Sequence, residues 1–84
     1  MRSGFWQDCT TTDFASLDAE RTVALLPVAA VEQHGPHLPV GTDAQIMEGY
    51  LARVVARLPR ESPVLFLPVQ AIGTSREHLA FPGT

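Results

Sequence analysis

Residues 22–28 read TVALLPV, a continuous apolar run rich in residues that favour strands. A second run of the same character, VLFLPV, occupies residues 64–69. Uninterrupted apolar runs of this length are typical of strands that are covered on both faces, as in parallel sheets. Pro27, near the end of the first run, predicts that the regular hydrogen-bond ladder stops or becomes irregular there.

Between the two runs, over residues 43–58, the apolar spacing becomes that of a helix. Asp43 stands where an N-cap is expected, and Pro59 where a helix ends. The order strand, helix, strand predicts an α/β fold built on a parallel βαβ unit. A shorter helix is expected from Thr11 to Glu20, with a threonine as its N-cap. The apolar positions of the longer helix are Ile46, Met47, Tyr50, Leu51, Val54, Val55 and Leu58.

Composition limits the classes of function. With 84 residues the chain forms at most one small domain, and 45% hydrophobic with 18% charged residues is typical of a soluble globular protein. A net charge of −3 and the lack of any lysine argue against nucleic acid as a partner. The longest apolar run is far below the roughly 20 residues of a membrane span. With no secretory signal and with Cys9 expected as a free thiol, we expect a cytoplasmic protein.

The loops that follow the two strands carry the polar chemistry. In a parallel sheet such loops emerge at the carboxyl edge, where open α/β proteins bind ligands. The first loop, residues 31–43, reads VEQHGPHLPVGTD, and the second, residues 71–84, reads AIGTSREHLAFPGT. The sequence therefore predicts that two histidine-bearing loops face the same crevice.

Three side chains of the first loop predict a metal site. Glu32 and His34 are two residues apart, so they project to the same side if the extended geometry persists, and Asp43 returns to the same edge. Carboxylate and imidazole donors suit Zn, Mn or Fe. The alternative is that Glu32 and His34 are ordinary loop polars and that Asp43 only caps its helix.

Two further histidines are candidates for the active site. His37 would serve as an additional ligand, as a proton carrier or as a group that orients a ligand, although an exposed loop histidine is the simpler interpretation. His78 would contact the substrate, or would only form a hydrogen bond to the backbone.

The segments LLPVAAVEQHGPHLPVGTDAQI (25–46) and EHLAFPGT (77–84) resemble conserved blocks of the creatininase (creatinine amidohydrolase) family. The resemblance implies that residues 1–84 are the N-terminal fragment of one three-layer α/β/α creatininase-like domain, whose C-terminal part lies outside this chain. It also implies two divalent ions, Zn, Mn or Fe, one bound by Glu32, the other by His34, and both bridged by Asp43.

The activity implied by the resemblance is metal-dependent hydrolysis of a non-peptide amide C–N bond by a metal-activated water. Within the family we expect a formamide deformylase or a mycofactocin-precursor peptidase rather than a creatininase, acting on a small-molecule amide as a homo-oligomer at full length. Residues 1–84 alone are expected to be inactive. The alternative is a non-catalytic βαβ module that binds a ligand or partner.

Overall fold

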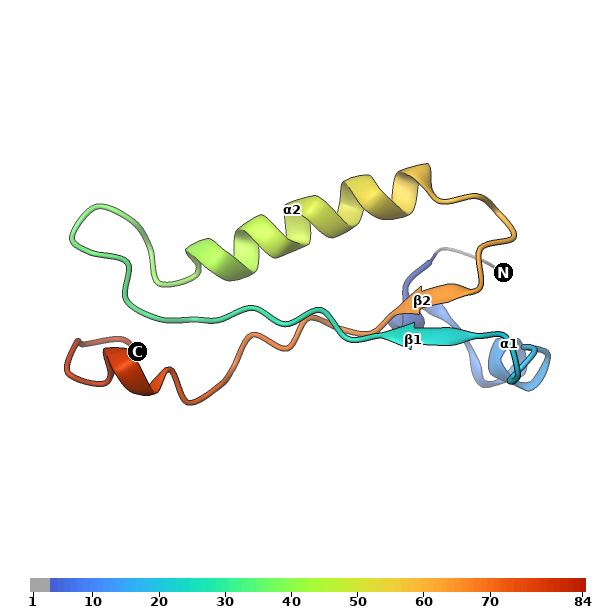
Figure 1. Ribbon diagram of the computed structural model, residues 1–84, viewed down its shortest axis with the longest axis horizontal. Helices are drawn as coiled ribbons and strands as arrows, with labels where there is room; N and C mark the ends of the chain where they lie inside the picture. Colours follow the sequence, from blue (N-terminus) through green and yellow to red (C-terminus); the bar gives the residue numbers. More distant parts are fainter. Residues whose placement is uncertain (1–3) are drawn as a thin grey trace.

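Two short parallel strands form the centre of the fold. In the computed structural model, which describes residues 4–84, β1 (Val23–Leu25) pairs with β2 (Val64–Phe66), with Val23 opposite Val64. An isolated bridge joins Phe5 to Phe66 in the parallel sense, so the N-terminal segment lies on the other side of β2. The predicted parallel βαβ unit is confirmed (Figure 1).

Both strands are shorter than the apolar runs that predicted them. The three-residue ladder stops at Leu25 and Phe66, and pairing resumes at the bridge between Val28 and Gln70. Proline has no N–H to donate, so the Pro27 position cannot continue a regular ladder, although its carbonyl still accepts from Gln70 N–H at 2.9 Å. The two extended segments therefore stay side by side as they approach the loops (Figure 1).

Helix α2 (Thr42–Arg57) leads from the end of the first loop back to the start of β2 (Figure 1). It ends as predicted, because Leu58 precedes proline and is extended, with φ −67° and ψ 141°. The predicted N-cap was wrong. Gly41 occupies that position without a side-chain cap, and Asp43 lies inside the first turn, where its carboxylate contacts His34 instead.

The core is small and lies between α2 and β2. Its buried hydrophobic residues are Leu51, Leu65 and Phe66. Burial of β1 on both faces was predicted wrongly, since Val23 is 51% and Leu25 39% exposed. Within residues 4–84, α2 is the one long helix, and it runs along one side of the strand pair (Figure 1). None of the helices in this part of the chain is long and apolar enough to cross a membrane.

The N-terminal region is built from η1 (Trp6–Asp8) and α1 (Thr11–Ala15). Thr10 and Asp13 form a capping box, so the predicted threonine cap is confirmed, but the helix ends five residues earlier than Glu20. The Ser16 hydroxyl donates to the Asp13 carbonyl and so competes for an acceptor of the helix backbone. The chain then turns back into β1.

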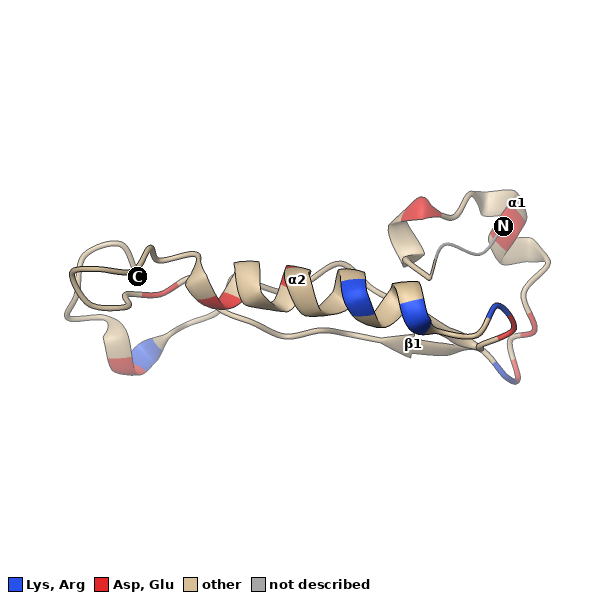
Figure 2. Cartoon of the chain, turned by 90° about the horizontal axis from the view of Figure 1, so that it is seen from above, with Lys and Arg blue, Asp and Glu red and all other residues tan. Residues whose placement is uncertain are grey.

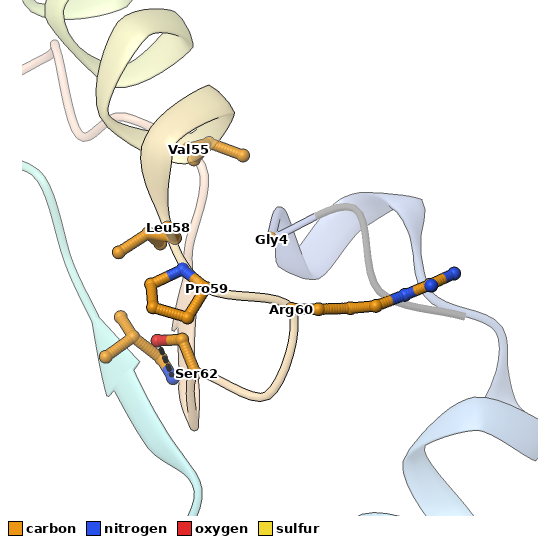
Figure 3. Close-up of a pocket in the computed structure, with 7 residues that line it drawn as sticks. Gly4, Val55, Leu58, Pro59, Arg60 and Ser62 are labelled. Carbon is orange, nitrogen blue, oxygen red and sulfur yellow. Dashed lines mark hydrogen bonds between the residues drawn. The ribbon is translucent and has the colours of Figure 1, made fainter.

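A small cavity of about 60 Å³ lies where the N-terminal region meets the end of α2. Gly4, Val55, Leu58 and Pro59 line it together with Arg60, Ser62 and Val64 (Figure 3). Gly4 has a φ of +94°, and a β-carbon there would lie 2.7 Å from Val55 Cγ1. Only a residue without a side chain fits this close approach.

Candidate metal centre

The two histidine-bearing loops meet at the end of the molecule away from the N-terminal region. Gln33 N–H donates to Thr84 Oγ1 at 3.1 Å, and the Gln33 amide nitrogen lies 2.8 Å from His78 Nδ1. The prediction that both loops lie together at the carboxyl edge is therefore confirmed. Acidic residues occur at this end together with Arg76, and the basic residues of α2 lie in its C-terminal half (Figure 2).

His34 and Asp43 form the closest pair of potential ligands. His34 Nε2 lies 3.0 Å from Asp43 Oδ1, and the two side chains are 24% and 39% exposed. On the other side of the ring, Nδ1 lies 3.1 Å from the backbone carbonyl of Glu32. A carbonyl oxygen can only accept, so Nδ1 carries the proton and donates it. Nε2 is then the ring nitrogen available to Asp43 or to a cation.

The surroundings of His34 stabilise its protonated form. The hydrogen bond to the Glu32 carbonyl is the largest cause that raises the pKa of His34 above its usual 6.5, and the carboxylate of Asp43 adds to it. Partial desolvation lowers the pKa and offsets only part of this effect. When no cation is bound, a proton on Nε2 is therefore favoured next to Asp43, and a cation that binds there has to replace it.

Glu32 points its carboxylate to a different partner. Its Oε1 lies 3.8 Å from His78 Nε2, and its side chain is only 15% exposed. Glu77 Oε1 lies 3.7 Å from the same nitrogen. Among residues 4–84, one group of three His, Cys, Asp or Glu side chains has ligand atoms that all lie within 4.8 Å of one another. It consists of Glu32, Glu77 and His78.

The three ligands predicted from the sequence thus fall into two neighbouring sets. His34 and Asp43 lie together, while the Glu32 carboxylate faces His78, so the three do not form one compact group in this part of the chain. The assignment of Glu32, His34 and Asp43 as ligands stays a prediction. Sequence reasoning missed Gln33, whose place between two predicted ligands was the available signal.

His37 lies in an exposed turn that begins at Gly35, where φ is +73°. Among the described residues His37 has no hydrogen-bond or ion-pair partner. Its predicted role therefore stays a prediction. The left-handed turn at Gly35 has a clearer effect, because it lets the Gly35 N–H donate back to Gln33 Oε1 at 3.0 Å.

The His34–Asp43 pair fits a divalent cation. Two ligand atoms that each lie about 2.1 Å from one ion are about 3.0–3.5 Å apart when they subtend right or tetrahedral angles. The observed separation of 3.0 Å is within this range. Metal-binding histidines also donate their second ring N–H to a carbonyl or carboxylate, as His34 does to Glu32.

The comparisons with known proteins identify the family of the chain. The family described as creatininase (creatinine amidohydrolase) matches residues 7–84. The chain belongs to the creatininase family. A mycofactocin precursor peptide peptidase of Mycolicibacterium smegmatis (strain ATCC 700084 / mc(2)155) is 42% identical over 64 residues, covering 74% of this chain and 26% of that protein.

Proteins with the same name from Mycobacterium tuberculosis (strain CDC 1551 / Oshkosh) and Mycobacterium ulcerans (strain Agy99) are each 42% identical, over 66 and 65 residues, covering 71% of this chain and 26% of each relative. The chain spans about a quarter of the length of the curated relatives that it matches. No solved structure gives a significant match. The predicted family is confirmed.

Proposed function

We propose that this chain supplies part of the divalent-metal centre of a hydrolase that cleaves an amide C–N bond. The observation that carries the proposal is the pair formed by His34 Nε2 and Asp43 Oδ1 at 3.0 Å, with His34 Nδ1 donating to the Glu32 carbonyl. This arrangement presents one nitrogen and one oxygen donor in a fixed orientation. Membership of the creatininase family supports the same chemistry.

The residues of the chain have separate tasks in this proposal. His34 and Asp43 hold the cation, and Glu32 supplies a further carboxylate beside them. When bound, the ion supplies a Lewis acid that activates water and polarises an amide carbonyl. Pro36 and Pro39 limit the conformations of the loop, which reduces the entropy lost when the ligands are ordered. We propose that His37, an exposed histidine of the same loop, carries a proton.

Zn, Mn and Fe all accept this donor set, and a complete site with two ions is part of the proposal. The substrate class is an amide. The sequence left a formamide and a precursor peptide as alternatives, and the names of the relatives favour the precursor peptide. We also propose that copies of the full polypeptide assemble into a homo-oligomer.

The test uses the polypeptide that carries this sequence at its full length. Metal content is measured by elemental analysis, and turnover is followed on a panel of formamides, cyclic amides and short peptides before and after chelation. We expect bound divalent metal, turnover that is lost with the metal, and loss of both in His34→Ala and Asp43→Ala. Asp8→Ala, an exposed acid in η1, is the matched control and should retain both.

Turnover that survives complete removal of the metal contradicts the proposal. If no panel member is cleaved, but a ligand still binds after Glu32, His34 and Asp43 are all replaced by alanine, the non-catalytic binding module is supported instead. Light scattering on the same preparation gives the mass of the assembly, and a monomeric mass contradicts the proposed homo-oligomer.

A further inference from the structure

The amide of Gln33 has a defined orientation. Its Oε1 accepts from the Gly35 N–H at 3.0 Å, and a backbone N–H can only donate, so the atom at this position is the oxygen. The opposite orientation would bring two donors together. The other end of the amide is therefore the NH₂ group, and it lies 2.8 Å from His78 Nδ1.

This orientation decides which nitrogen of His78 carries the proton. An amide NH₂ donates and does not accept, so His78 Nδ1 must accept with its lone pair. The proton of the neutral ring is then on Nε2. That nitrogen faces the carboxylates of Glu32 at 3.8 Å and Glu77 at 3.7 Å.

The charges around Nε2 agree with this tautomer. An N–H directed at two carboxylates is attracted to them, whereas a lone pair in the same place would be repelled. Distances of 3.7 and 3.8 Å are too long for direct hydrogen bonds, and a bridging water or a small rotation of the ring would complete the contact.

The two histidines therefore carry their ring protons on opposite nitrogens. His34 donates from Nδ1 to the Glu32 carbonyl and leaves Nε2 available as a ligand. His78 accepts at Nδ1 from Gln33 and directs an N–H from Nε2 toward Glu32. A ring with Nδ1 engaged by a donor and Nε2 protonated has no lone pair to give to a cation.

We propose that Gln33 is a positioning residue that fixes the tautomer of His78, so that His78 holds the Glu32 carboxylate through its Nε2–H and does not bind the metal. Glu32, Glu77 and His78 are then not a three-ligand cation site, although their atoms lie close together. The part that concerns the metal rests on the proposed function. The assignment of the tautomer does not depend on it.

The tautomer is measured by ¹⁵N NMR on histidine-labelled protein at full length, because protonated and unprotonated ring nitrogens have well-separated shifts. The His78 signals are assigned by their loss in His78→Asn. We expect an unprotonated Nδ1 and a protonated Nε2 in the neutral ring. A neutral ring with its proton on Nδ1 overturns the proposal, and this measurement needs no variant of Gln33.

The variant Gln33→Glu has nearly the same shape, but it replaces the NH₂ donor by an acceptor. Its carboxylate can still accept from the Gly35 N–H, so the loop keeps that hydrogen bond. We expect Nδ1 of His78 to gain a proton in this variant. The control Gln7→Glu adds the same charge in η1, at the other end of the molecule, and should leave His78 unchanged. An Nδ1 that stays unprotonated in Gln33→Glu overturns the proposal.

Zinc titration of the unmodified, metal-free protein separates the two histidines. We expect the Nε2 signal of His34 to move to a metal-bound shift, while the signals of His78 keep the pattern of the Nε2–H tautomer. A metal-bound shift for His78 overturns the proposal. If neither histidine responds to zinc but His78 shows the expected tautomer, the proposed function fails while the role of Gln33 in fixing the tautomer is supported.

Discussion

Replacing Asp43 with asparagine tests the metal site with little change of shape. The start of α2 should survive, because the N-cap is Gly41 and the Thr42 hydroxyl donates to the Pro39 carbonyl at 2.6 Å. The variant loses the favourable interaction of a carboxylate with the first turn of a helix, about 0.3–1 kcal/mol, and the ion pair with His34, which contributes little because both side chains are accessible to solvent. We therefore expect the free energy of unfolding to fall by no more than about 1 kcal/mol.

The effect on metal binding should be much larger. Asp43 Oδ1 and His34 Nε2 are the two closest donors, so the variant removes one of the pair and its negative charge. Loss of a group that only orients a ligand commonly lowers metal affinity about 10- to 100-fold. Asp43 is proposed to touch the ion itself, so we expect a loss above about 100-fold, equal to about 2.8 kcal/mol.

Isothermal titration calorimetry with zinc or manganese on the chelator-stripped full polypeptide measures this loss. Asp8→Asn removes the same charge from an exposed position in η1 and should bind metal as the unmodified protein does. Urea unfolding of all three proteins without metal checks that the fold is intact. If Asp43→Asn folds normally and its metal affinity is within about threefold of the unmodified protein, the assignment of Asp43 is refuted.

Three further predictions concern pH and packing. Because the pKa of His34 is raised, the stability contributed by its protonated form is present below about pH 6.5 and is lost as the pH rises through the raised pKa. Zinc affinity should increase over the same rise in pH, because the ring loses the proton that competes with the metal. A zinc affinity that is constant between about pH 5 and 8 contradicts this prediction. Leu65→Ala empties a fully buried position and should lower the free energy of unfolding in urea by about 2–5 kcal/mol. Leu26→Ala, at a half-exposed position, should lower it by about 1 kcal/mol or less, and equal losses argue against the core described above. Gly4→Ala should cost about 1–3 kcal/mol, partly recovered by Val55→Ala, and the absence of any loss contradicts the close approach of these residues.

The sequence predicted those features of the fold that depend on local chemistry. The 3.6-residue period of apolar side chains fixes α2, and Pro59 fixes its end, because proline restricts the residue before it whatever packs nearby. The parallel order of β1 and β2 followed from the helix between them. The same order placed both loops at one edge, which the contacts of Gln33 confirm.

Burial was harder to predict because it depends on what covers a residue. On α2, the side chains at 47, 51 and 55 are buried or partly buried, as is Leu58 just after it, while the adjacent stripe of Ile46, Tyr50 and Val54 is 44–65% exposed. The periodic pattern contains both stripes and cannot tell them apart. The exposed face of β1 has the same cause, since among residues 4–84 one long helix covers one side of the strands.

The candidate site was predicted by residue type but not by pairing. The spacing of Glu32 and His34 suggested a shared side, yet the left-handed turn at Gly35 and the return of the chain at Asp43 lead His34 to Asp43. Glu32 turns to His78, a residue 46 positions away in the chain. Contacts of this kind depend on the tertiary arrangement, and a motif read along one loop does not contain them.

Gln33 connects the two sets of ligands. Through its backbone N–H it binds Thr84, and through its side chain it binds both Gly35 and His78. Gln33 thus joins the first loop to the second, and its side-chain amide sets the direction of the hydrogen bond at His78 Nδ1. A residue that can neither ionise nor coordinate zinc strongly therefore has a decisive place between two predicted ligands. A substitution of Gln33 should alter the Glu32–His78 contact more than the His34–Asp43 pair. The reason is that His34 is oriented by the Glu32 carbonyl and not by the glutamine side chain.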